Sequence, residues 1–179
     1  MTNAEQPLKI LFLAAEVVPF AKTGGLADVA GALPKALRAL GHDARVAMPR
    51  YGRIDVDKFN LARRLPQYPV ALGDQELPAE LYEGSIGESV PIYFVENSRF
   101  YDRDGIYMYP DDAERFIFFC RAILEALPQL DWKPDIIHCN DWHTAIVPNW
   151  LKTIYADHPY LRQAATVYTI HNLAYQGIY

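Results

Sequence analysis

The sequence is poor in the features that mark secreted, membrane-spanning or nucleic-acid-binding proteins. Its 179 residues include only two cysteines, too few for a disulfide scaffold and without the spacing of a zinc site. No apolar run reaches the ~20 residues that a membrane-spanning helix needs. The net charge is −5, and no stripe of Lys and Arg indicates a nucleic-acid partner. The N-terminus lacks the basic, apolar and small-residue segments of a signal peptide.

We therefore expect a cytoplasmic protein that has neither nucleic acid nor a membrane as its partner. Cys120 and Cys139 lie in apolar runs, and we expect both to be reduced thiols in the core. A hydrophobic content of 51% and a charged content of 22% are ordinary for a globular domain, and 179 residues suffice for one core. We expect residues 1–8 to be a flexible lead-in and residues 9–179 to form one domain.

Apolar runs alternate with helical patterns along most of the chain. Continuous apolar runs predict buried parallel strands over 9–16, 43–48 and 135–139, and β-branched residues predict another over 166–170. Strands that alternate with helices are typical of an α/β fold with a doubly wound, Rossmann-like and mostly parallel sheet. We expect ligands to bind outside the carboxyl ends of these strands.

Three helices are expected between the strands. The first has an apolar face and ends at Gly41, and Pro34 must either kink it or begin a second segment. Its apolar face is Leu26, Val29, Ala30, Leu33, Leu37 and Leu40. The second begins near Asp111 or Asp112, where Asp111 and Glu114 have capping-box spacing, and it ends at Pro128. Its apolar face is Phe116, Phe119, Cys120, Ile123, Leu124 and Leu127. The third spans 142–156, with Pro148 tolerated near its first turn.

Residues 49–96 contain shorter strand-like runs. Those at 70–72 and 79–82 are separated by turn residues and predict an inserted antiparallel hairpin. The run at 91–95 predicts a return to the main sheet.

The segment Lys22-Thr23-Gly24-Gly25-Leu26-Ala27-Asp28-Val29 joins the first strand to the first helix. Adjacent glycines let a ligand approach the backbone, and free N–H groups at the start of a helix attract anions. Lys22 adds a positive charge beside them, so the segment suits a phosphate or a sugar hydroxyl. Neither G-x-G-x-x-G nor G-x-x-x-x-G-K-[ST] is present.

The segment His138-Cys139-Asn140-Asp141-Trp142-His143 closes the strand at 135–139. Strand alternation places His138 and Asn140 on one side, and Cys139 and Asp141 on the other. A metal site from His138, Asp141 and His143 lacks a supporting motif. In the simplest structural alternative, Asp141 only caps the following helix.

Two further polar segments follow strand-like runs. Thr169-Ile170-His171-Asn172-Leu173-Ala174-Tyr175-Gln176-Gly177 places His171 in a turn, where we expect it to face a cleft. Tyr101-Asp102-Arg103-Asp104-Gly105-Ile106-Tyr107 alone is a polar turn.

Taken together, these segments resemble the bacterial glycogen synthases and plant starch synthases of glycosyltransferase family 5. The strings are K-T/V-G-G-L-A/G-D-V, Y-D-R-x-G-x-Y, H-x-H/N-D-W-H and T-x-H-N-L-A-Y-Q-G, and they occur in the family's order from Lys9 to Tyr179. The resemblance implies the N-terminal half of an enzyme with two Rossmann-like domains, the GT-B arrangement.

The resemblance also implies roles for individual residues. Glu16, Asp141 and His171 would be catalytic. Residues implied to bind the substrates are Lys22, Gly24, Gly25, Asp28, Tyr107, His143 and Asn172. The tyrosine that faces the sugar is Tyr107 or Tyr109, and no metal or other cofactor is implied.

The implied reaction is the retaining transfer of glucose from ADP-glucose to the non-reducing end of an α-1,4-glucan. Nothing in this sequence corresponds to the family's C-terminal, nucleotide-binding domain. We therefore expect a truncated chain that is inactive alone and that exposes apolar surface. A non-catalytic glucan-binding module, or another GT-B transferase that uses UDP-glucose, remain alternatives.

Overall fold

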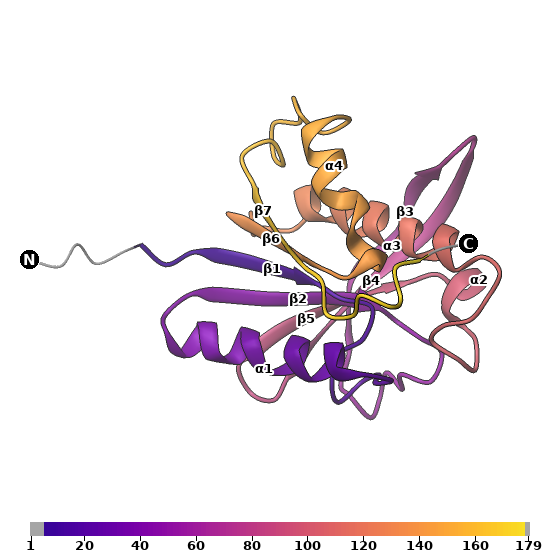
Figure 1. The fold of residues 1–179 in the computed structure, drawn as a ribbon, viewed down its shortest axis with the longest axis horizontal. Helices are drawn as coiled ribbons and strands as arrows, with labels where there is room; N and C mark the ends of the chain where they lie inside the picture. Colours follow the sequence, from indigo (N-terminus) through magenta and orange to yellow (C-terminus); the bar gives the residue numbers. More distant parts are fainter. Residues whose placement is uncertain (1–5, 178–179) are drawn as a thin grey trace, which may run out of the picture.

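The computed structural model describes residues 6–177, which form one sheet with helices on both faces (Figure 1). The strand order is β3-β4-β5-β2-β1-β6-β7. The strands are β1 (Lys9–Leu13), β2 (Asp43–Pro49), β3 (Ala62–Leu72), β4 (Gln75–Ile86), β5 (Val90–Glu96), β6 (Ile136–Asn140) and β7 (Ala165–Thr169). The helices are α1 (Gly25–Ala39), α2 (Ser98–Tyr101), α3 (Asp112–Ala126) and α4 (Ile146–Lys152), with the 3-10 turns η1 (Leu127–Gln129) and η2 (Trp142–Thr144).

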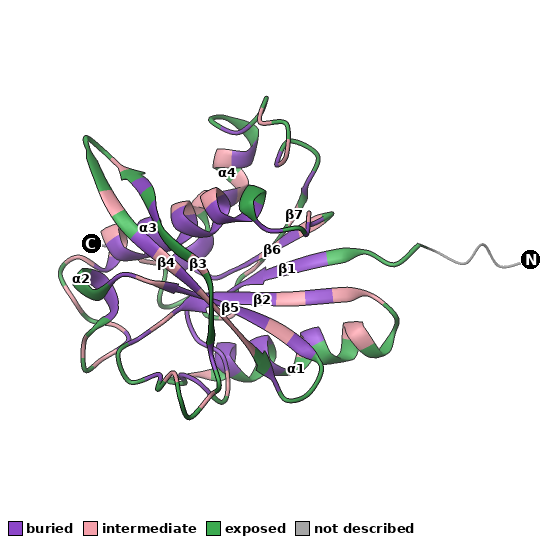
Figure 2. Ribbon diagram, turned by 180° about the vertical axis from the view of Figure 1, so that it is seen from behind, coloured by how far each residue is buried: buried purple, intermediate pink, exposed green. Residues whose placement is uncertain are grey.

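Five adjacent strands, from β5 to the edge strand β7, are parallel, which confirms the predicted α/β class. β1 pairs with β2 and β6, β2 pairs with β5, and β6 pairs with β7. Residues 10–13 of β1 are buried, as a continuous apolar run predicts for a strand that is covered on both faces (Figure 2). Because the carboxyl ends of these strands share one sheet edge, the loops that follow them meet there.

Helices cover both faces of the sheet because its connections run in opposite directions. The chain passes from β1 to β2 on one side of β1, and from β6 to β7 on the other. Right-handed crossovers then place α1 and α4 on opposite faces. Figure 1 shows α1 below the sheet, and α3 and α4 above it.

The predicted hairpin is present but longer than expected. β3 and β4 are antiparallel over 62–86, and β4 also pairs antiparallel with β5, so the hairpin extends the main sheet. The exposed residues of both strands are mainly charged or polar residues, proline and alanine, which hid the length of the strands from a search for apolar runs. The run at 91–95 lies in β5, as predicted.

Helix α1 is one continuous helix with Pro34 inside it, which settles the open question. Gly41 has a φ of +95° and lies just beyond the helix, as predicted. Two members of the expected apolar face are instead exposed: Val29 at 39% and Leu40 at 75%. The buried stripe of α1 is narrower than the sequence periodicity suggested.

The capping box predicted for α3 is wrong. Asp111 is the N-cap residue, but its side chain makes no capping bond. Its carboxylate instead accepts two hydrogen bonds from Arg103, each at 2.6 Å, and Glu114 pairs with Arg99. The apolar face of α3 is buried as expected, and Pro128 follows its end in η1.

The single helix predicted over 142–156 is also wrong, because the segment divides into η2 and α4. Pro148 is the third residue of α4, where its missing N–H costs no helical bond. The backbone at Thr153, with φ −121° and ψ −90°, ends α4 at Lys152, four residues before the expected end.

The expectation for the two cysteines is confirmed. Cys120 and Cys139 are both buried and free. Met1–Glu5 of the expected lead-in lie outside the described residues, and residues 6–8 have no regular secondary structure. Within residues 6–177, no helix is long and apolar enough to cross a membrane. Exposed apolar side chains gather around β7 and the segment after it: Val167, Tyr168, Ile170, Leu173 and Tyr175.

Candidate active site

The loops after β1, β6 and β7 bring most of the predicted site residues to the carboxyl edge of the sheet. Glu16 follows β1, Asp141 follows β6, and His171 follows β7. Because these three strands are neighbours, their loops are within contact of one another.

Glu16 holds the Gly-Gly loop in place. Its carboxylate is buried and accepts the backbone N–H of Thr23, the Thr23 hydroxyl at 3.0 Å and the Gly24 N–H at 3.1 Å. The first N–H groups before α1 are therefore satisfied within the chain. The Gly24 N–H faces Glu16 rather than an incoming anion.

Neither glycine of this loop is required by the packing of the chain itself. Gly24 has a φ of −143°, and a Cβ there would meet Glu16 at 3.7 Å, an ordinary contact distance. A Cβ at Gly25 would meet nothing within 4 Å. By contrast, a Cβ at Gly31 would lie 2.4 Å from Val18. What Gly25 provides is open space above the start of α1, where a ligand can approach the backbone.

Lys22 and Asp28, both predicted to bind substrate, pair with each other. The Lys22 ammonium lies 2.7 and 2.8 Å from the two Asp28 carboxylate oxygens. Their side chains are about half exposed, so the pair contributes little to stability. The ammonium can leave this partner at small cost when a more negative group arrives.

Asp141 joins the end of β6 to the loop after β7. Its N–H donates to the Thr169 carbonyl at 2.9 Å, and its Oδ1 accepts the His171 backbone N–H at 2.6 Å. Its φ of 56° and ψ of 179° lie in a region populated essentially by glycine, at a cost of about 1–3 kcal/mol. The buried carboxylate and these two bonds hold the residue in that conformation.

The predicted alternation of side chains along β6 does not continue through Asp141. Asn140 and Asp141 were expected on opposite sides, yet both contact His171. The left-handed φ of Asp141 ends the strand alternation at that residue. Asp141 is the N-cap residue of η2, but its side chain makes no capping hydrogen bond. The alternative in which Asp141 only caps the following helix is therefore wrong.

Tyr107 links Glu16 to His143. Its hydroxyl donates to Glu16 Oε1 at 3.2 Å, and its ring stacks on His143 with centroids 5.0 Å apart. Burial raises the pKa of Tyr107, and the charge of Glu16 adds to this. Tyr109 is placed differently, because its hydroxyl accepts the Gly105 N–H at 2.8 Å. Of the two tyrosines, Tyr107 is therefore the one in contact with the other predicted residues.

A buried arginine that the sequence analysis missed positions Tyr107. Arg115 is fully buried, and its Nη1 donates to the Ile106 carbonyl and to Asp112, both at 2.9 Å. Aromatic rings lie 5.2–5.7 Å from the guanidinium: Tyr51, Tyr101, Tyr109 and Phe116. The sequence could have indicated this role, because Arg115 lies four residues before Phe119 and therefore on the same, buried face of α3.

His143 is neutral and packed among aromatic rings. Burial, with a smaller effect of the Arg115 charge, lowers its pKa to about 3. The Trp142, Phe116 and Tyr107 rings lie 4.1–5.0 Å away. Its Nδ1 is buried and has no hydrogen-bond partner among the described residues. A cleft of about 310 Å³ adjoins the ring, lined also by Phe116, Ile117, Trp142 and Gly177.

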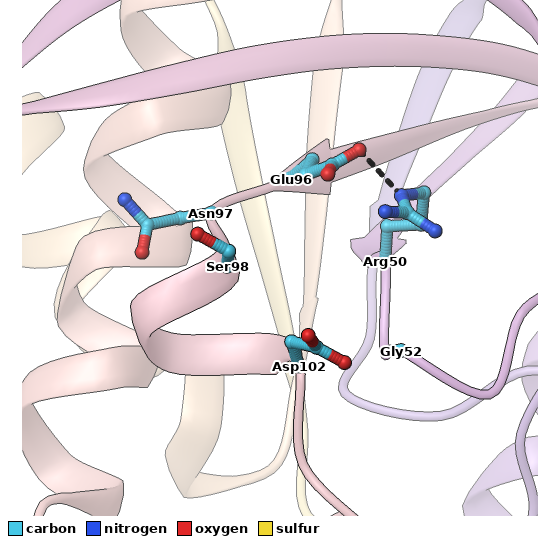
Figure 3. Close-up of a pocket in the computed structure, with 6 residues that line it drawn as sticks. All are labelled: Arg50, Gly52, Glu96, Asn97, Ser98 and Asp102. Atoms are coloured by element: carbon cyan, nitrogen blue, oxygen red, sulfur yellow. Dashed lines mark hydrogen bonds and ion pairs between the residues drawn. The ribbon is translucent and has the colours of Figure 1, made fainter.

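A second, smaller cavity lies at the carboxyl ends of β2 and β5 (Figure 3). Its volume is about 110 Å³, and its lining is polar: Arg50, Gly52, Glu96, Asn97, Ser98 and Asp102. Arg50 and Glu96 form an ion pair at 2.6 Å. None of the predicted site residues lines this cavity.

The remaining predicted residues are less closely connected. Asn172 is exposed, and its side chain accepts the Ala174 N–H at 2.8 Å within its own turn. His138 contacts the Thr169 hydroxyl at 2.7 Å, and burial lowers its pKa. In residues 6–177, no group of three or more His, Cys, Asp or Glu side chains is arranged to hold a metal ion.

Two other contributors were not predicted. Thr23 donates to Glu16 through its hydroxyl, and nothing in its own residue type distinguished it. Asn140 contacts the His171 ring. Asn140 could have been predicted as a site residue because it is a polar residue at the end of a buried strand.

The fold and this edge define a doubly wound α/β domain with a polar ligand site formed by loops at the carboxyl ends of its strands. Residues 9–179 match the family model of the starch synthase catalytic domain, and the chain belongs to that family.

Similar proteins agree with this assignment. Glycogen synthase of Desulforudis audaxviator is 50% identical over 97% of this chain and 36% of its own length. That of Moorella thermoacetica is 51% identical over 97% of this chain and 35% of its own. A solved structure, the catalytic domain of starch synthase IV from Arabidopsis thaliana bound to ADP and acarbose, is 36% identical with a TM-score of 0.87. That match covers 96% of this chain and 35% of the other. The chain thus spans about a third of the length of these relatives.

Replacing Asp141 by glycine should leave the fold more stable than replacing it by alanine. Both changes remove the bond to the His171 N–H, but only glycine relieves the backbone at φ 56°. We expect a difference of about 1–3 kcal/mol in the free energy of unfolding, measured in urea. The same pair of substitutions at Thr166, in the regular strand β7, should favour alanine. Equal stabilities at position 141 would contradict the strain.

The free energy of unfolding should decrease as the pH falls, because His143 is buried as a neutral ring. Its pKa is about 3 in the folded chain, against an ordinary value of 6.5, so the unfolded chain takes up a proton first as the pH falls. The contribution is complete above pH 6.5 and is lost toward pH 3, at up to about 1.4 kcal/mol per pH unit. His143→Phe should therefore show a shallower decline in unfolding free energy between pH 6.5 and 4.

Phe118→Leu serves as the control for this experiment, because it perturbs a buried side chain without a titrating group. It should lower stability by a similar amount at every pH. A pH slope for His143→Phe equal to that of the parent chain would rule out the buried neutral imidazole.

Proposed function

We propose that residues 9–179 are the N-terminal domain of a cytoplasmic glycogen or starch synthase. The reaction is the retaining transfer of glucose from ADP-glucose to the non-reducing end of an α-1,4-glucan. Activity requires a second, nucleotide-binding domain, and this domain supplies one wall of the active site. The presence of ADP and acarbose on the Arabidopsis relative favours an adenine nucleotide donor and a glucan acceptor.

One observation carries the proposal: a series of contacts connects the Gly-Gly loop to His171. Gly24 donates to Glu16, Glu16 accepts from Tyr107, and Tyr107 stacks on His143. The turn that carries His143 begins at Asp141, which accepts the His171 N–H. Residues that the resemblance assigned to one substrate site are thus mutually positioned by the chain.

This arrangement suits transfer through a transition state in which positive charge develops on the sugar and negative charge on the departing diphosphate. The open backbone at Gly25 and the mobile charge of Lys22 favour the diphosphate. Asp141 and His171 face the sugar and hold its hydroxyls. Glu16 contributes by holding the loop and Tyr107.

The whole protein, including its nucleotide-binding domain, should incorporate glucose from ADP-glucose into maltooligosaccharides, and the 179-residue chain alone should not. Lys22→Ala should raise the donor KM by about tenfold, because one charged contact to phosphate is lost. His171→Ala should lower kcat by roughly a hundredfold. Lys58→Ala, at an exposed lysine outside the site, is the matched control.

Wild-type kinetics for both site variants would exclude this assignment of residues. Binding of maltooligosaccharide by the whole protein without any transfer would instead support a glucan-binding module. Incorporation from UDP-glucose in preference to ADP-glucose would contradict the donor proposed here.

A further inference from the structure

Asn140, the last residue of β6, contacts three segments at the carboxyl edge of the sheet. Its side chain is buried with the residue only 2% exposed. Nδ2 lies 3.0 Å from the Leu13 carbonyl at the end of β1 and 3.2 Å from the His138 carbonyl. Oδ1 lies 2.9 Å from Nε2 of His171, in the loop after β7.

These contacts determine which way the Asn140 amide points. Its NH2 group has two donors and meets two carbonyl acceptors, Leu13 and His138. The reversed amide would place its oxygen against both carbonyls and leave a buried oxygen with repulsive neighbours. Oδ1 is therefore the atom that faces His171, and it can only accept.

An acceptor at 2.9 Å requires a proton on the His171 nitrogen that faces it. In the neutral ring that proton is on Nε2, so Nδ1 carries the lone pair. Within residues 6–177, the hydrogen bond recorded for the ring is the one through Nε2. The lone pair of Nδ1 is therefore available to accept a hydrogen bond from a ligand.

We propose that Asn140 is a positioning residue that fixes the tautomer and the rotation of the His171 ring, so that Nδ1 accepts a hydrogen bond from a sugar hydroxyl. The role of the ligand rests on the proposed function, whereas the ring geometry does not. Asp141 holds the His171 backbone and Asn140 holds its ring, so consecutive residues fix both parts of the same histidine.

The tautomer is tested first on the unaltered 179-residue chain. Nitrogen-15 NMR of the histidine rings distinguishes the proton-bearing nitrogen from the bare one, and His171→Gln assigns the signal. We expect the proton of the neutral ring on Nε2. A neutral ring that carries its proton on Nδ1 overturns the proposal, whether or not any variant folds.

A variant then tests the cause. Asn140→Leu keeps the size of the side chain but removes the acceptor, so the Nε2 proton should exchange with water roughly three- to tenfold faster, the worth of one hydrogen bond. Asn97→Leu is the matched control. Asn97 is also buried after a strand and bonds to backbone, but it lines the small polar cavity and does not contact His171. An unchanged exchange rate in Asn140→Leu overturns the proposal.

Kinetics of the whole protein separate positioning from substrate binding. Asn140→Leu should lower kcat by about ten- to a hundredfold through misplacement of His171, with the donor KM nearly unchanged. A rise in KM alone, with kcat intact, contradicts a positioning role. If the whole protein transfers no glucose while the ring has its proton on Nε2, the proposed function fails and the ring geometry stands.

Discussion

Buried carboxylates that accept backbone N–H groups organise the carboxyl edge of this sheet. The Glu16 carboxylate accepts hydrogen bonds from the backbone N–H groups of Thr23 and Gly24. The Asp141 carboxylate accepts one from the backbone N–H of His171. A hydrogen bond to a charged group contributes about 1.5–3 kcal/mol, and a buried carboxylate without partners is costly. Before any ligand arrives, Glu16 holds the loop that follows its own strand, β1, and Asp141 holds the loop that follows the neighbouring strand β7. This is the preorganisation that electrostatic catalysis requires.

The other side of the site is aromatic and almost uncharged. Tyr107 and His143 stack, and the burial that lowers the pKa of His143 leaves it a neutral ring. The buried cation behind them, Arg115, is paired with Asp112 and holds the loop that carries Tyr107. Among the described residues, His143 Nδ1 lies beside the apolar cleft without a hydrogen-bond partner, and Nε and Nη2 of the buried Arg115 also have none.

The sequence predicted those parts of the fold that depend on local patterns. Apolar runs located β1, β2, β5 and β6, β-branched residues located β7, and strand ends located the polar loops. Contacts between distant segments could not be predicted this way. The partner of Asp111 is Arg103 rather than the expected Glu114, and Trp142 begins a separate turn because the backbone at Asp141 leaves the regular strand. The roles of Asn140 and Arg115 likewise depend on which strands are neighbours, which periodicity does not specify.

Hydrogen exchange of individual backbone amides, followed by NMR on the 179-residue chain, tests the central claim most directly. The account predicts that the amides of Thr23, Gly24 and His171 are protected although they lie in loops, because buried carboxylates hold them. The Ala174 amide, bonded only within an exposed turn, should exchange much faster. Exchange of all four at the rate of an exposed loop would show that the edge is not preorganised, and would contradict the account.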